Sequence, residues 1–380
     1  MIYLDHAATT PLPEAVADTM YDVLRHQFGN PSAQYPLGRE AKELVEEARR
    51  TIAGALGCQP SALHFTSCGT ESDNWAIRAA AWQGRHTGRH IITTAVEHSA
   101  VLEPCRQLEQ EGYEVTYLKP DRTGHISAEQ VAEALREDTV LVSVMLVNNE
   151  TGCLFPVADI ARLLKERGSR ALLHCDAVQG FLKVPCDPAG WGVDLMSLSA
   201  HKIGGPKGIG ALYVRPDLRN LRNLRPLLAG GGQEEGLRSG TEATAQIAGF
   251  AKAVALRQEG LEEKLAHMAR IKAYCRERLL SIPGVVPVGG GEAPHILAVS
   301  LVGYPSANVI NDLGSQGICL SAGSACHRGK ASRGYAALGL DKRTAAGVLR
   351  LSFGPETTEG DIDALYEALL RHKNTRFSML

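Results

Sequence analysis

The chain has 380 residues, of which 44% are hydrophobic and 22% are charged, with a formal net charge of −2. This length and composition fit an ordinary soluble globular protein with two domains, or one large α/β body with an appendage. A charge so close to zero gives no reason to expect nucleic acid or a membrane surface as a partner. The sequence shows neither an apolar run of about 18 residues nor a secretory signal, and we expect a cytoplasmic protein.

The nine cysteines are scattered along the chain, odd in number and without CxxC spacing. This pattern argues against a disulfide framework and against a zinc ribbon. We expect most of them to be small buried side chains. The sequence therefore predicts no metal site, and a functional cysteine has to be identified by its surroundings.

The N-terminal residues are expected to form an extended segment followed by two helices. Residues 1–4 are apolar, and residues 5–12 carry small and hydroxyl side chains up to a proline, which suggests a backbone that approaches another group closely. Apolar spacing then predicts helices at 13–26 and 38–56.

From residue 62 onward strands and helices alternate. The predicted strands are 62–66, 90–94, 114–118, 139–147, 171–175, 195–199 and 210–214, and the predicted helices begin near Trp75 and span 99–111, 127–135 and 157–167. Alternation of this kind implies βαβ units. We expect an α/β fold with a mostly parallel central sheet and helices on both faces.

The last third has a different texture. A glycine-rich loop at 230–241 precedes helices that run from Glu242 past Ala255 and from 261 to 280. The remaining predicted elements are a strand at 295–301, a helix at 306–315, a strand at 318–321, a loop to about 335, a strand at 348–353 and a helix at 359–370. We predict a large α/β domain over 13–255 and a smaller α+β domain over 256–380, joined by segment 1–12.

Lys202 lies in a glycine-rich loop between two predicted strands. A lysine amine held at one point and partly desolvated is nucleophilic enough to form a Schiff base with an aldehyde. The alternative is a solvated glycine turn with a surface lysine. Ligands of parallel sheets collect outside the carboxyl ends of the strands, so the polar residues that follow the other strands bear on this choice.

Those polar residues supply what pyridoxal phosphate requires. The cofactor needs a lysine, a carboxylate for its ring nitrogen, a flat face to stack on and donors for its phosphate. Lys202 suits the first role and Asp176 the second, while Gln179 could donate to the ring hydroxyl and His98 could stack on the ring. Each has an ordinary alternative: Asp176 as a helix cap, Gln179 in solvent and His98 as a structural histidine.

Residues 67–74 pass from a predicted strand into a helix. Gly69 and Thr70 at such a turn expose backbone N–H groups at the positive end of the helix, which suits a phosphate. The alternative is a simple N-cap.

In these residues the chain resembles the cysteine desulfurases of the NifS/IscS type, within the class V aminotransferase group of fold type I enzymes. Ser199-Ala-His-Lys202 and Gly323-Ser-Ala-Cys326 are the most specific segments together. The matching segments follow the family's order: 3–11, 66–74, 97–98, 147–152, 174–179, the Lys202 loop, 238–241, 321–326 and 349–354.

The resemblance implies a role for each matching residue. Lys202 would bind pyridoxal phosphate covalently, and His98 would stack on its ring and, with Lys202, move protons. The other cofactor-binding residues would be Asp176, Gln179, Asn149, Gly69, Thr70, Ser199 and His201, with Thr241 supplied by the partner subunit of a homodimer. Arg350 would clamp the substrate carboxylate as a bidentate fork, near Asn149.

Cys326 is the cysteine with a functional context. It lies in a glycine- and serine-rich stretch with basic neighbours, which favour the thiolate. The resemblance implies that it takes sulfur from L-cysteine as a persulfide, releases L-alanine and passes the sulfur to an acceptor protein in iron–sulfur cluster assembly or tRNA thiolation. Selenocysteine lyase, another lyase or aminotransferase with the same cofactor, and a silent scaffold stay open as alternatives.

Overall fold

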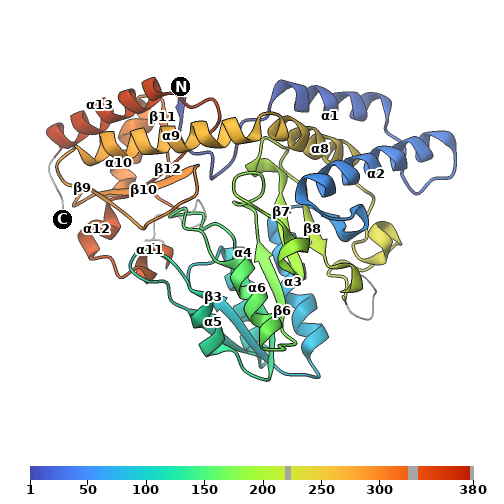
Figure 1. Ribbon diagram of the computed structural model, residues 1–380. Coiled ribbons are helices and arrows are strands. Elements are labelled where there is room, and N and C mark those ends of the chain that lie inside the picture. Colours follow the sequence, from blue (N-terminus) through green and yellow to red (C-terminus); the bar gives the residue numbers. More distant parts are fainter. Residues whose placement is uncertain (219–223, 324–332, 377–380) are drawn as a thin grey trace.

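The structure is a computed structural model, and it describes residues 1–218, 224–323 and 333–376 (Figure 1). Its largest feature is a seven-stranded sheet, beside which lie a three-stranded and a two-stranded sheet. Within these described ranges, no helix is both long and apolar enough to cross a membrane.

The large sheet has the strand order β2-β8-β7-β6-β5-β3-β4. Its strands are β2 (Leu63–Thr66), β3 (His90–Thr94), β4 (Glu114–Leu118), β5 (Thr139–Met145), β6 (Leu172–Asp176), β7 (Leu195–Ser199) and β8 (Gly210–Val214). Neighbouring strands are parallel except at β8, which is antiparallel to both β2 and β7. The predicted α/β fold with a mostly parallel sheet is confirmed.

Both faces of this sheet are covered, because successive residues of a strand point to opposite sides. In β3, Ile92 packs into one core and Ile91 into the other. One face is covered by α2 (Pro36–Leu56), α5 (Ala128–Ala134), α6 (Val157–Glu166) and α8 (Thr244–Gln258), and the other by α3 (Gly69–Gly84) and α4 (Ser99–Gln110). Helix α1 (Glu14–His26) packs on α8, and the short helices α7 (Pro188–Trp191), η1 (Pro60–Ala62), η2 (Ala200–Lys202), η3 (Pro216–Leu218) and η4 (Gln233–Gly236) lie in connections.

Residues 261–323 and 333–376, the C-terminal body, form the second part of the molecule. Its described elements are α9 (Leu261–Leu280), α10 (Ser306–Ser315), α11 (Arg333–Ala337), α12 (Lys342–Ala346), α13 (Glu359–Thr375), β9 (Val285–Pro287), β10 (Ile296–Leu301), β11 (Ile318–Cys319) and β12 (Val348–Ser352). Helices α8 and α9 follow one another along one side of the molecule and lead from the large sheet to this body (Figure 1).

The N-terminal segment is part of the C-terminal body's packing. Strand β1 (Ile2–Tyr3) pairs with β11 in parallel, and Asp5 forms a bridge with Ser352. Leu4 is fully buried in the core that α9, β10, β12 and α13 share. The domain boundary between 255 and 256 stays a prediction.

Some predicted elements differ from those in the structure. Helix α3 begins at Gly69 rather than near Trp75, because its polar first turns are already ordered: Glu71 accepts a hydrogen bond from the backbone of Ser67 and pairs with Arg238. The strand predicted at 318–321 ends at Cys319, and α13 continues to Thr375. Strand β9 and helix α12 were not predicted, since both are too short to show a period.

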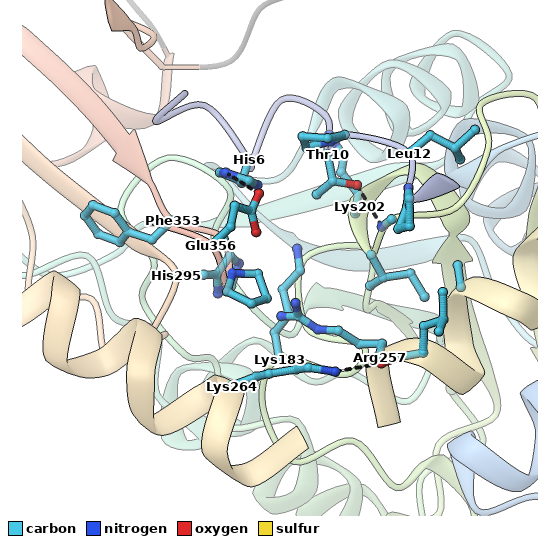
Figure 2. Close-up of a pocket in the computed structure, with 18 of the residues that line it drawn as sticks. His6, Thr10, Leu12, Lys183, Lys202, Arg257, Lys264, His295, Phe353 and Glu356 are labelled. Carbon is cyan, nitrogen blue, oxygen red and sulfur yellow. Dashed lines mark hydrogen bonds and ion pairs between the residues drawn. The ribbon is translucent and has the colours of Figure 1, made fainter. Parts of the chain in front are cut away.

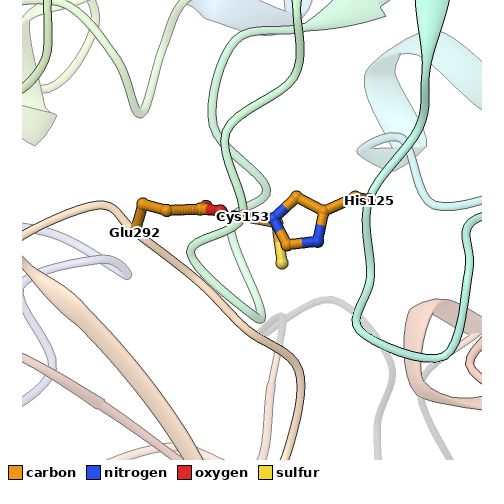
Figure 3. A group of neighbouring side chains, drawn as sticks. All are labelled: His125, Cys153 and Glu292. Carbon is orange, nitrogen blue, oxygen red and sulfur yellow. Dashed lines mark hydrogen bonds and ion pairs between the residues drawn. The ribbon is translucent and has the colours of Figure 1, made fainter.

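His125, Cys153 and Glu292 link the large sheet's connections to the C-terminal body (Figure 3). His125 Nε2 lies 2.5 Å from Glu292 Oε1, and Glu292 Oε2 accepts a hydrogen bond from the backbone N–H of Leu154 at 3.0 Å. The thiol of Cys153 donates to the carbonyl of Thr123 at 3.3 Å. These side chains are of metal-ligand types, but each already has a protein partner, and we interpret the group as a structural link.

Candidate active site

A cavity of about 270 Å³, the strand-end cavity, lies where the carboxyl ends of β2, β3, β5, β6 and β7 meet. These ends share one edge of the sheet because the five strands run in the same direction. The predicted site residues that line it are Gly69, Thr70, His98, Asn149, Asp176, Gln179, Ser199, His201, Lys202 and Arg350. Thr241 is exposed before α8 and does not line it, and Cys326 lies in 324–332, outside the described residues.

One end of the strand-end cavity is suited to a phosphate group. No side chain caps the first turn of α3, which starts at Gly69. A Cβ on Gly69 would lie 2.7 Å from Val178 Cγ2, so only glycine leaves this cradle open. Ser199 Oγ is buried and has no hydrogen-bond partner in the described part of the chain. Uncapped N–H groups and an unsatisfied hydroxyl fit the phosphate of pyridoxal phosphate.

His201 adds a neutral donor near this end. Burial, with a smaller contribution from the charge of Lys202, lowers the pKa of His201 to about 3, so the ring is neutral at pH 7. Its Nδ1 lies 3.2 Å from Thr9 Oγ1. A neutral imidazole that accepts a hydrogen bond at Nδ1 carries its proton on Nε2, where it can be donated.

Two buried acids, Asp73 and Asp176, line the strand-end cavity, and a third, Glu97, is buried close enough for its charge to interact with that of Asp176. Burial and repulsion from Asp176 raise the pKa of Asp73 well above its usual range, and burial raises the pKa of Glu97 to about 8. Burial also raises the pKa of Asp176, but the charges of His98 and Lys202 oppose this. Asp176 is therefore the acid best able to stay ionised and face a protonated ring nitrogen. Asp73 was not predicted, although it lies in the matching segment 66–74.

The side chains of His98 and Gln179 are held by hydrogen bonds to other parts of the protein. His98 is the N-cap of α4, and its Nδ1 accepts a hydrogen bond from the backbone N–H of Ala100 at 3.1 Å. Gln179 Nε2 donates to the Ala7 carbonyl at 2.8 Å, while its Oε1 lies 3.2 Å from Lys183 Nζ. Both side chains are thus fixed in orientation before a ligand arrives.

Lys202 lies at the end of η2, facing the N-terminal segment. Its Nζ donates hydrogen bonds to the carbonyl oxygens of Ala7 and Ala8, both at 2.8 Å. The Ala7 N–H in turn donates to Ser352 Oγ at 2.8 Å. The close backbone approach predicted for residues 5–12 is therefore an approach to this lysine, and two carbonyl dipoles hold its amine at a fixed point.

Arg350 comes from β12 in the C-terminal body and is 2% exposed. Its Nη1 donates to the Asn149 carbonyl at 2.9 Å, and its Nη2 lies 2.8 Å from Asp5 Oδ1. Its Nε is buried without a partner among the residues described. Asp5 was not predicted as a site residue, because nothing in the local sequence indicates a contact so far along the chain. A substrate carboxylate would compete with Asp5 for this guanidinium.

Comparisons with known proteins identify the family of the chain. The family model described as Aminotransferase class-V matches residues 2–365. The chain is 41% identical over 359 residues to a putative cysteine desulfurase IscS 1 of Bacillus subtilis (strain 168), covering 93% of each chain. It is also 41% identical over 377 residues to a cysteine desulfurase IscS of Vibrio campbellii (strain ATCC BAA-1116), covering 97% of this chain and 91% of that protein.

Solved structures of related proteins have the same fold. A NifS-like protein superposes with a TM-score of 0.93 at 36% identity, covering 99% of this chain and 100% of that one. SspA, solved in complex with cysteine, superposes with a TM-score of 0.81 at 34% identity, covering 94% of this chain and 100% of that one.

Proposed function

The chain belongs to the aminotransferase class-V family, and from this membership we propose that it is a pyridoxal phosphate-dependent cysteine desulfurase. The observation that carries the proposal is the strand-end cavity, which gathers a lysine, a buried aspartate, a histidine and an arginine around one point. The relatives named cysteine desulfurase support the reaction, and the neighbour solved with cysteine supports the substrate class.

The residues of the strand-end cavity divide the work of holding the cofactor and the substrate. When bound, pyridoxal phosphate supplies an electron sink for the amino acid joined to it. Gly69, Thr70, Ser199 and His201 would hold its phosphate, and Asp176 would keep its ring nitrogen protonated. Lys202 would hold its aldehyde, and Arg350 would bind the substrate carboxylate.

Cys326 would then remove the sulfur. Its thiolate attacks the sulfur of bound L-cysteine, so that an S–S bond forms and the substrate Cβ–S bond breaks. The electron pair of the broken bond goes to the substrate Cβ, which takes a proton from Lys202 or His98. The product then leaves as L-alanine. Cys326 is left as a persulfide, and an acceptor thiol takes its outer sulfur.

Replacing Cys326 with alanine tests this reaction. We expect alanine release from L-cysteine, with a reductant present, to fall by roughly 10²-fold or more, because the nucleophile is gone. Release from selenocysteine should persist, since selenium is the better leaving group. The matched control is Cys319→Ala on β11, which should keep both activities. Mass spectrometry after brief exposure to L-cysteine should find one added sulfur on Cys326.

Other outcomes would favour the alternatives. Undiminished alanine release by Cys326→Ala would contradict the desulfurase reaction, and consumption or formation of a keto acid would favour an aminotransferase. Equal or greater activity of the intact protein on selenocysteine, with no sulfur added to Cys326, would favour a selenocysteine lyase. A purified protein that lacks the yellow absorbance of a Schiff base between lysine and pyridoxal phosphate, even after the cofactor is added and its excess removed, would favour a scaffold.

The assembly and location are further parts of this proposal. We infer a cytoplasmic homodimer in which Thr241 of one subunit completes the phosphate site of the other, and which donates sulfur to an iron–sulfur scaffold or a tRNA-thiolation enzyme. The exposed position of Thr241, away from the cavity of its own chain, is consistent with a role toward a second subunit. Sedimentation of the cofactor-loaded protein at several concentrations tests the dimer.

A further inference from the structure

A second cavity, of about 470 Å³, lies on the other side of the Lys202 loop (Figure 2). It is enclosed by the N-terminal segment, α8, α9 and the residues after β12, and it shares only Lys202 with the strand-end cavity. Basic side chains dominate its polar lining: His6, Lys183, Lys202, Arg257, Lys264 and His295, against the acids Glu259 and Glu356. We call it the basic cavity.

Lys183 is buried in the wall of the basic cavity, with an exposure of 4%. An ammonium group has three donors, and its one hydrogen bond within the described structure goes to Gln179 Oε1 at 3.2 Å. None of the described carboxylates forms an ion pair with it. Burial lowers the pKa of Lys183 well below its usual range, and the charges of Arg257 and Lys202 lower it further. The amine therefore lacks a counter-charge.

Arg257 on α8 is only partly buried, and it too has weak polar contacts in the described structure. Its guanidinium contacts the Leu182 carbonyl at 3.4 Å and Met268 Sδ at 3.7 Å, which are long, weak contacts. No ion pair of Arg257 is found in the described ranges either. Figure 2 shows the side chains of Lys183 and Arg257 extending toward the middle of the basic cavity. A guanidinium and an amine whose pKa is lowered by burial thus share one space.

His295 completes the group. It is 1% exposed, its Nε2 lies 3.3 Å from Gln179 Oε1, and its Nδ1 has no hydrogen-bond partner among the described residues. Buried polar atoms are normally satisfied, and buried charges are normally paired, because leaving water costs free energy. The acid nearest to supplying a counter-charge is Glu356, whose charge acts on Arg257 from a distance, but it is 61% exposed and forms its ion pair with His6 at 3.4 Å.

We propose that the basic cavity binds a compact oxyanion, of carboxylate or phosphate type, between Lys183, Arg257 and His295. One anion would satisfy the ammonium, the guanidinium and the imidazole together. The apolar side chains of Leu12, Leu256 and Phe353 line the rest of the cavity and leave room for a short apolar body. Binding at this site does not depend on the proposed sulfur chemistry.

Thermal unfolding of the cofactor-loaded protein tests the proposal, with inorganic phosphate and butyrate as separate probes at constant ionic strength. A ligand that binds the folded state raises the melting temperature in a saturable way. We expect such a rise for the unaltered protein, with butyrate favoured if the apolar wall contributes. Arg257→Leu and Lys183→Met should each weaken the apparent affinity roughly tenfold or more, because each removes a charged donor.

Two further variants separate this site from a general charge effect. Lys264→Met is the matched control, since Lys264 lies on the same cavity but its Nζ already donates to the carbonyl oxygens of Leu256, at 2.7 Å, and Glu259. It should respond like the unaltered protein. Glu356→Gln should bind the probes more tightly, because it removes the acid that repels them. Weaker binding by Glu356→Gln would overturn the proposal.

Crystals of the cofactor-loaded protein soaked in selenate give a test that needs no variant. We expect an anomalous peak between Lys183 and Arg257. The absence of a peak there at saturating selenate would overturn the proposal, as would an unaltered thermal response in both Lys183→Met and Arg257→Leu. Alanine release from L-cysteine is measured on the same protein, so failure of the anion site and failure of the desulfurase proposal can be told apart.

Discussion

The strand-end cavity and the basic cavity adjoin at Lys202 but differ in the titratable groups around them. The first has the acids Asp73 and Asp176 in its lining, with Glu97 buried nearby, whereas the second has Lys183 and Arg257. The acids relieve their repulsion internally, because carboxyl groups can take up protons near neutral pH; a guanidinium has no such route. The difference shows that an unpaired charge inside a protein indicates a ligand site most clearly where neither gain nor loss of a proton can neutralise it.

The largest expected effect is on the rate of alanine formation, and it tests which buried acid keeps its charge. Asp176→Asn should reduce alanine formation from L-cysteine roughly 10²–10³-fold, because the anion that faces the ring nitrogen is lost. Asp73→Asn is the matched change and should cost less than about tenfold, since burial and repulsion from Asp176 raise the pKa of Asp73 and so favour its neutral form, which an amide resembles in charge. Steady-state rates at saturating cofactor provide the measurement. Equal losses in the two variants would show that the acids share the role.

A second prediction concerns the pH dependence of stability. Glu97 holds its proton up to a pKa of about 8 in the folded state, but releases it near its ordinary pKa of 4.5 when unfolded. The folded state therefore binds more protons between these values, and stability falls as pH rises through this window.

Glu97→Gln removes this dependence. Relative to the variant, the unaltered protein should lose roughly 2–4 kcal/mol of unfolding free energy between pH 5 and pH 8, about the size expected from the shift. Denaturant unfolding at several pH values measures the difference. Glu133→Gln, at an exposed position on α5, should show no such trend. A constant difference between the unaltered protein and Glu97→Gln across the window would mean that Glu97 is ionised when buried.

The smallest effect concerns the phosphate cradle, where the proposed binding of an anion would use neutral donors rather than cations. Gly69→Ala would place a Cβ 2.7 Å from Val178 Cγ2 and 3.5 Å from Ser199 Cβ. We expect affinity for pyridoxal phosphate to fall roughly tenfold, because the helix start must shift by a fraction of an ångström. Gly314→Ala in α10, with no atoms within 4 Å of its new Cβ, is the control. Titration of cofactor absorbance compares the two.

The cavity residues at strand ends could be predicted from sequence because parallel strands bring their carboxyl ends together. Strands β3, β4, β7 and β8 were predicted with the bounds they have, since each is a short apolar run between polar turns. Once those ends were known, Asp176 and Lys202 could be predicted as neighbours.

Contacts between distant segments could not be predicted in this way. Asp5 meets Arg350 across 345 residues, and Lys183 and Arg257 stand in sequences that read as ordinary surface helix or turn. Periodicity indicates which face of an element is buried, but it does not indicate which other element covers that face. The Cys326 prediction lies outside the described residues and stays a prediction.

The hold on the Lys202 amine has a consequence for how the protein is made. Ala7 supplies one of the carbonyls that bind the amine, and Ala7 is itself held by Ser352, 345 residues later. On the ribosome, the lysine is synthesised long before the strand that fixes its surroundings. The site is therefore complete only once β12 has been made and has docked, so we expect only the finished chain to capture pyridoxal phosphate tightly.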